Sequence, residues 1–183
     1  MPEIKKTNNW YVITGGPCAG KTSLLEVMAK RGYHVEFEIA RIYIDEQIAL
    51  GKSLQEIRRD ESAFQKEILK RKFELEKTLS RDELILFDRG ILDTIAYYEL
   101  IGLSKDAEKL RKTIKITNYK KIFLLDLLDF KQDYARVEDK ETAYKIQKLL
   151  GKSYQELGFE VTTVPVPISK NIEERADFII KNL

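Results

Sequence analysis

The sequence has only one cysteine and one histidine among its 183 residues. Cys18 alone cannot form an intramolecular disulfide, and a zinc site built from several cysteines or histidines is excluded. No segment approaches the roughly 18 apolar residues of a membrane span, because the longest one, residues 122–130, is interrupted by Asp126 and Asp129. The first ten residues lack the apolar core of a secretory signal. We therefore expect a cytoplasmic protein.

An excess of charge of one sign is also lacking, since 32 basic residues face 30 acidic residues. This balance argues against a protein dedicated to nucleic-acid binding. Basic residues are nevertheless concentrated between residues 105 and 121, where seven are Lys or Arg. We favour a solvated helix face there, with binding to anionic lipid or nucleic acid as the alternative. The length and the 43% of hydrophobic residues predict one domain over residues 1–183 with a sizeable core.

Glycine and proline are few, and short apolar segments alternate with longer segments of helical spacing. The expected strands are residues 10–14, 34–37, 84–87, 121–125 and 159–164. The expected helices are residues 21–31, 39–50, 91–101, 141–157 and 172–183, together with one long helix from Ser53 to Leu79. Ser53 and Glu56 form a capping box at its start. The alternation predicts an α/β fold with a parallel sheet, which binds ligands at the carboxyl ends of its strands.

A phosphate-binding motif, G-x-x-x-x-G-K-[ST], directly follows the first expected strand. Its glycines allow backbone N–H groups to surround a polyphosphate at the start of a helix. Lys21 is expected to reach the β- and γ-phosphates, and the Thr22 hydroxyl to ligate Mg²⁺. Cys18 is interpreted as a small loop residue. The predicted nucleotide-binding residues are Gly15, Gly16, Pro17, Cys18, Ala19, Gly20, Lys21, Thr22 and Ser23.

A second acidic site follows the strand at 84–87, which ends in Asp88-Arg89-Gly90. A P-loop enzyme needs a carboxylate opposite its Thr or Ser to hold Mg²⁺, directly or through water. Asp88 is the predicted metal-side residue, and Arg89 is expected near the phosphates. For Asp93 two interpretations stay open: a helix N-terminal residue favoured by the dipole, or a contact to substrate or metal.

These two motifs, GGPCAGKTS and FDRGILDTIAYY, resemble the P-loop kinases that include thymidylate and nucleoside kinases. The resemblance is closer to the NadR-type family of ribosylnicotinamide-kinase-like ATPases, since residues 38–41 (E-I-A-R) and 133–139 are similar to its E-x-A-R element and lid. It implies a three-layer P-loop NTPase fold, with helices flanking a five-stranded parallel sheet and a short lid. In this kinase group the strand ending at Asp88 lies directly beside the first strand.

The remaining site residues are predicted with less support from motifs. Glu38 is expected to act on the acceptor, and Arg136 to close over the phosphates as a lid arginine, with Lys131 as a lesser candidate. Arg41 either binds an acceptor phosphate or pairs with Glu38. Gln65 is interpreted as a solvated helix residue, with hydrogen bonding to an acceptor base as the alternative.

The predicted activity is that of a Mg²⁺-dependent small-molecule kinase with Lys21, Asp88, Arg136 and Glu38 as catalytic residues. The chain lacks the N-K-x-D tetrad by which G-proteins read guanine, which favours ATP over GTP. The partners are then a nucleotide and a nucleoside-like or other small hydroxyl acceptor. The alternative is an NTP hydrolase or switch module without such an acceptor.

Overall fold

The computed structural model describes residues 8–114, 119–128 and 139–183, and its centre is a five-stranded parallel sheet. The strands are β1 (Trp10–Thr14), β2 (His34–Glu36), β3 (Ile85–Asp88), β4 (Lys121–Leu125) and β5 (Val161–Val164). Their order is β2-β3-β1-β4-β5. The predicted neighbour relation is confirmed, because Ile13 of β1 lies opposite Asp88 of β3. The carboxyl ends of these two strands therefore meet at one edge of the sheet.

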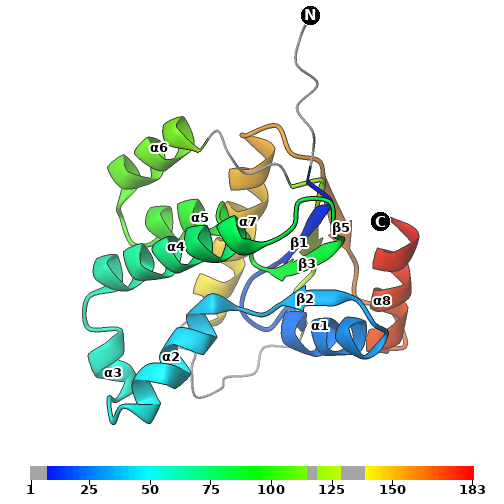
Figure 1. Ribbon diagram of the computed structural model, residues 1–183, viewed down its shortest axis with the longest axis horizontal. Coiled ribbons are helices and arrows are strands. Elements are labelled where there is room, and N and C mark those ends of the chain that lie inside the picture. The colour runs from blue at the N-terminus through cyan, green and yellow to red at the C-terminus, as the bar shows by residue number, and fades with distance from the viewer. Residues whose placement is uncertain (1–7, 115–118, 129–138) are drawn as a thin grey trace, which may run out of the picture.

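Helices cover both faces of the sheet (Figure 1). α1 (Lys21–Lys30) and α8 (Ile172–Lys181) pack on one face, while α5 (Asp93–Leu100) and α7 (Lys140–Gln155) pack on the other. Alternate residues of each strand point to opposite faces. Tyr11 and Ile13 accordingly belong to the α1/α8 core, and Trp10 and Val12 to the opposite core. The predicted three-layer α/β fold is confirmed.

The remaining helices extend from this core. α4 (Glu61–Thr78) and α6 (Ser104–Thr113) lie on the α5 side, and α2 (Ile39–Ala49) and α3 (Leu54–Ile57) project beyond the carboxyl edge of the sheet (Figure 1). Within the described ranges, no helix combines the length and the apolar character needed to cross a bilayer.

The long helix predicted from Ser53 is wrong, because the segment forms the two helices α3 and α4. Ser53 does close a capping box with Glu56, as expected, but α3 ends after one turn. The Asp60 backbone is extended there, and its carboxylate accepts a hydrogen bond from the Ala63 N–H at 2.9 Å. A second N-cap therefore starts α4 where the periodicity suggested continuous helix. The other predicted strands and helices match the observed boundaries to within two residues.

Candidate phosphate-binding and acceptor site

The loop between β1 and α1 has a backbone that only glycine fits at two points. Gly15 has φ of +152°, and a Cβ there would lie 2.8 Å from the Leu125 carbonyl oxygen. A Cβ at Gly16 would lie 2.8 Å from the carbonyl oxygen of Ala143. Side chains at these positions would collide with backbone that cannot move aside. The loop is thus packed directly against β4 and α7.

Lys21 is buried beneath the loop that it follows. Its Nζ donates to the carbonyl oxygens of Gly15 and Gly16 at 3.0 and 3.1 Å. Burial, together with the charge of Arg89, lowers the pKa of Lys21 to about 8, against the raising effect of Asp88 and other carboxylates. The ammonium is therefore held at the centre of the site. Thr22 follows it on the first turn of α1 and is exposed.

Asp88 is the most unusual group of the site, because it is buried and unsatisfied. Its residue exposure is 2%, and neither carboxylate oxygen has a hydrogen-bond partner among the described residues. Burial and the neighbouring Glu38 raise the pKa of Asp88 to about 7, although Lys21 and Arg89 oppose this. Orphaned carboxylate oxygens at the end of a strand beside the phosphate loop fit a hard cation such as Mg²⁺.

Glu38 is held in the ionised state by Arg89. Arg89 has φ of +69°, and its Nε donates to Glu38 Oε1 at 2.8 Å. Burial by itself would raise the pKa of Glu38, but Arg89 and Lys21 outweigh that effect and bring it to about 2. The two carboxylates at this edge, Glu38 and Asp88, therefore differ strongly in their affinity for a proton.

Asp93 anchors the Asp88-Arg89-Gly90 turn from behind. One of its oxygens accepts from the Thr14 hydroxyl at 2.5 Å and from Arg89 Nη1 at 3.4 Å. The other accepts from the Gly90 N–H at 2.9 Å and from the Tyr154 hydroxyl at 2.5 Å. Each oxygen already has two donors, which favours the helix N-terminal interpretation of Asp93 over a metal contact. The sequence contained no signal for Thr14 or Tyr154 at this site.

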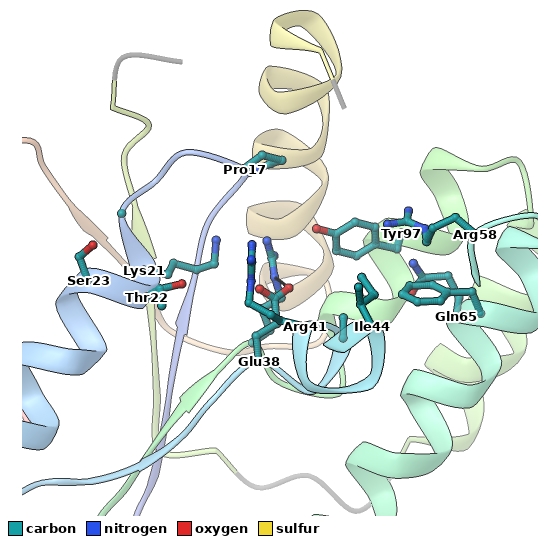
Figure 2. Close-up of a pocket in the computed structure, with 14 residues that line it drawn as sticks. Pro17, Lys21, Thr22, Ser23, Glu38, Arg41, Ile44, Arg58, Gln65 and Tyr97 are labelled. Atoms are coloured by element: carbon teal, nitrogen blue, oxygen red, sulfur yellow. Dashed lines mark hydrogen bonds and ion pairs between the residues drawn. The ribbon is translucent and has the colours of Figure 1, made fainter. Parts of the chain in front are cut away.

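A cleft of about 140 Å³ continues from the phosphate loop toward α4 and α5. Figure 2 shows Lys21, Glu38 and Arg41 converging at its middle, with Tyr97 and Gln65 toward its far end. Arg89 also lines the cleft together with Lys21 and Thr22, close to the loop as expected.

The far end of the cleft is aromatic and carries an amide. Phe64 and Tyr97 line it together with Gln65. The interpretation of Gln65 as solvated is wrong, because only 6% of the residue is exposed. No hydrogen bond joins its carboxamide to any residue of the described ranges. The burial of Gln65 was missed because helix periodicity assigns apolar residues to the buried face. The buried strip of α4 instead combines Ile68 with the polar Gln65 and Lys72.

Arg58 and Arg41 add positive charge to the same walls. Arg58 donates to both carboxylate oxygens of Glu61, at 2.6 and 2.9 Å, and its guanidinium lies 4.5 Å from the centre of the Phe64 ring. Arg41 points toward Lys21 and Glu38 (Figure 2). Its two interpretations, anion binding and pairing with Glu38, both agree with this position.

Two predicted lid residues, Arg136 and Lys131, lie outside the described residues. The basic segment is described in part, and several of its charges have acidic partners. Arg111 pairs with Glu99, Lys112 with Glu108, and Lys121 with Glu160. These pairs favour a solvated face over a surface for anionic lipid.

A glycine-rich loop between β1 and α1, with β3 directly beside β1, defines a P-loop protein with a kinase-like fold. A family model described as an AAA domain matches residues 10–175, and the chain belongs to this family. No curated protein matches the chain.

Solved structures of nucleoside and nucleotide kinases share the fold. A NadR protein in complex with NR matches with a TM-score of 0.69 and 19% identity, over 96% of this chain and 50% of its own. Deoxyadenosine kinase from M. mycoides matches with a TM-score of 0.66 and 13% identity, over 94% and 97% of the two chains. Thymidylate kinase from Ehrlichia chaffeensis matches with a TM-score of 0.65 and 14% identity, over 94% and 96%.

Proposed function

We propose that the protein is a Mg²⁺-dependent, ATP-using kinase that transfers the γ-phosphoryl group to a hydroxyl of a nucleoside-like small molecule. The observation that carries this proposal is that one continuous cleft joins the phosphate loop to the aromatic residues. It runs from the phosphate loop, past the ionised Glu38, to an amide and two aromatic rings. A protein that only hydrolysed nucleotide would need no pocket for a flat acceptor beyond the loop.

The donor end of the cleft matches the needs of phosphoryl transfer. When nucleotide binds, the two hydrogen bonds from Lys21 to loop carbonyls would be replaced by hydrogen bonds to the β- and γ-phosphates. These bonds are stronger because both partners are charged. Asp88 and Thr22 would hold Mg²⁺, directly or through water, and a bound ion would supply positive charge for the phosphate oxygens. Arg136 lies outside the described residues, and its role as a lid arginine stays a prediction.

Glu38 is suited to orient the acceptor hydroxyl rather than to remove its proton early. With a pKa of about 2 the carboxylate is a weak base, but it is fully ionised and accepts a hydrogen bond. Phosphoryl transfer passes through a loose transition state in which little proton removal is needed before the bond to the leaving group breaks. Arg89 keeps the carboxylate in this state and in this position.

The far end of the cleft supports a flat heterocycle as the rest of the acceptor. The Gln65 carboxamide lines the cleft and offers both a donor and an acceptor, which suits the edge of a heterocyclic ring. Phe64 and Tyr97 supply apolar surface beside it. The structural neighbours in complex with dATP and with NR bind ligands of this kind.

The test is a phosphorylation assay with Mg²⁺ and either ATP or GTP against a panel of nucleosides, ribosylnicotinamide and simple alcohols. We expect one heterocyclic acceptor to be phosphorylated, and ATP to be the better donor. Lys21→Ala should abolish binding that depends on the phosphates. Gln65→Leu should lower kcat/KM for the acceptor about 10- to 100-fold and leave ATP affinity unchanged.

Gln155→Leu is the matched control, because Gln155 is exposed on α7 and should tolerate the same change. ATP binding and hydrolysis without phosphorylation of any acceptor would refute the kinase and favour the hydrolase or switch module. Equal kcat/KM values for the Gln65 and Gln155 variants would refute the proposal that Gln65 binds the ring of the acceptor.

A further inference from the structure

Arg175 of α8 is a buried arginine that joins the phosphate loop to the ends of two strands. Only 2% of the residue is exposed. Its Nη1 donates to the Ala19 carbonyl oxygen at 2.7 Å. Its Nη2 donates to the carbonyl of Asp126 at 2.8 Å and lies 3.4 Å from that of Val164, and its Nε donates to the carbonyl of Pro165 at 3.0 Å.

The contact with Ala19 fixes the direction of the next N–H group. The peptide between Ala19 and Gly20 is planar and trans, so its C=O and its N–H point to opposite sides. Arg175 draws the carbonyl to the side of α8. The N–H of Gly20 therefore points away from α8, and Gly20 lines the cleft. A peptide turned over by half a rotation would present a carbonyl oxygen to the phosphates and repel them.

Packing of α8 does not by itself require this arginine. α8 is already fastened to α1 by apolar contacts and by Arg31, which pairs with Glu173 and with Asp177 on the surface. A guanidinium is costly to bury, and burial lowers the pKa of Arg175 although Asp126 opposes this. An apolar side chain would fill the same space without that cost, but it could not hold four carbonyls in a fixed pattern.

We propose that Arg175 is a positioning residue for nucleotide binding, which acts by holding the Ala19–Gly20 peptide with its N–H toward the phosphates. The inference rests on the proposed binding of nucleotide at residues 15–22. The Gly20 N–H would contact only the phosphate chain of the nucleotide, so Arg175 should not affect binding of the base or of the acceptor. The inference therefore applies equally to ATP, ADP and inorganic tripolyphosphate.

The experiment compares wild-type protein with Arg175→Met and Arg175→Lys, using calorimetric titration of ATP and tripolyphosphate well below the unfolding temperature. Loss of one correctly aimed N–H should weaken both ligands about 10- to 100-fold in Arg175→Met. Arg175→Lys should fall between, because an ammonium keeps the charge but lacks the planar fork. Arg31→Met is the matched control: it loosens the α1–α8 surface contact without touching the loop, so affinity should not change.

A direct readout follows the Gly20 amide by NMR. Ala19–Gly20 is the only Ala-Gly pair in the sequence, so labelling alanine carbonyl carbon and glycine nitrogen selects this one signal. Tripolyphosphate should shift the signal strongly in the wild type and Arg31→Met, and much less in the Arg175 variants.

Each outcome decides a different point. Wild-type protein that binds neither ATP nor tripolyphosphate refutes the nucleotide site itself. The positioning role is refuted if folded Arg175→Met binds both ligands with the same affinity as the wild type and shows the same shift of the Gly20 signal. If Arg175→Met does not fold, Arg175→Lys decides alone, and wild-type affinity with a wild-type shift again overturns the proposal.

Discussion

The Asp93→Asn substitution tests whether the buried carboxylate at the start of α5 holds the Asp88–Gly90 turn. Asp93 is fully buried, and each of its oxygens accepts from two donors. Asparagine has one carbonyl oxygen and one NH₂ group. Whichever way the amide is turned, its NH₂ faces two donors. On one side these include the Gly90 N–H, and on the other they include the Arg89 guanidinium, neither of which can become an acceptor.

The expected loss of stability follows from these contacts. Hydrogen bonds to a charged group contribute about 1.5–3 kcal/mol each, and at least one is lost. The substitution also leaves a buried donor unsatisfied and removes charge that balances Arg89. We expect the free energy of unfolding to fall by about 3–5 kcal/mol, the range for breaking a buried ion pair. A native domain has only about 5–15 kcal/mol of stability in total.

Equilibrium unfolding in urea at neutral pH measures this change, provided that the slope with denaturant stays constant. Asp177→Asn is the control, because the Asp177 side chain is 58% exposed in its pair with Arg31 and should cost less than about 1 kcal/mol. If Asp93→Asn costs no more than this control, the four hydrogen bonds do not hold the turn, and the geometry of Asp88 and Arg89 must have another origin.

Three further outcomes are expected. The pKa of Asp88 is raised, so the folded state keeps a proton that the unfolded chain loses, and this stabilising contribution is lost as pH rises from about 4 to about 7. Asp88→Asn should therefore raise the unfolding temperature at pH 8 while removing the Mg²⁺ dependence of ATP binding. Glu38→Gln should lower kcat about 10²-fold with unchanged ATP affinity, measured by steady-state kinetics and titration. Gly16→Ala should weaken ATP binding in the same titration, because its Cβ would lie 2.8 Å from the Ala143 carbonyl.

The parts of the fold that sequence patterns predicted are those determined by neighbours along the chain. Alternating apolar segments place all five strands, and the glycine-rich motif places Lys21 at the start of α1. Asp88 was found because it ends a strand that is apolar throughout. The position of β3 beside β1 came from the resemblance to a kinase group rather than from periodicity, and the structure confirms it.

The parts that were missed depend on contacts between distant segments. Thr14 and Tyr154 lie 79 and 61 residues from Asp93, with which they share hydrogen bonds. Arg175 lies 156 residues from Ala19. In sequence Arg175 is a charged residue in a charged helix, and nothing local distinguishes it from Arg31 on the surface. Gln65 is similar, because a glutamine becomes informative only when burial shows that solvent does not surround it.

The pairing of Arg89 explains how one edge of the sheet holds two carboxylates with different properties. Arg89 gives its Nε to Glu38 and one terminal nitrogen to Asp93, and no hydrogen bond from any described residue reaches Asp88. Burial raises the pKa of Asp88 to about 7, whereas for Glu38 the charges of Arg89 and Lys21 outweigh burial and lower the pKa to about 2. Two acids with widely separated pKa values are suited to different roles. Glu38, already paired with Arg89, stays ionised and can accept a hydrogen bond from the hydroxyl of the molecule to be phosphorylated. The unsatisfied Asp88 gains most from a cation, which would replace its proton and offset the cost of burying its charge. In the proposed kinase, exchanging the two roles would place a metal ion against Arg89, where its charge would be repelled.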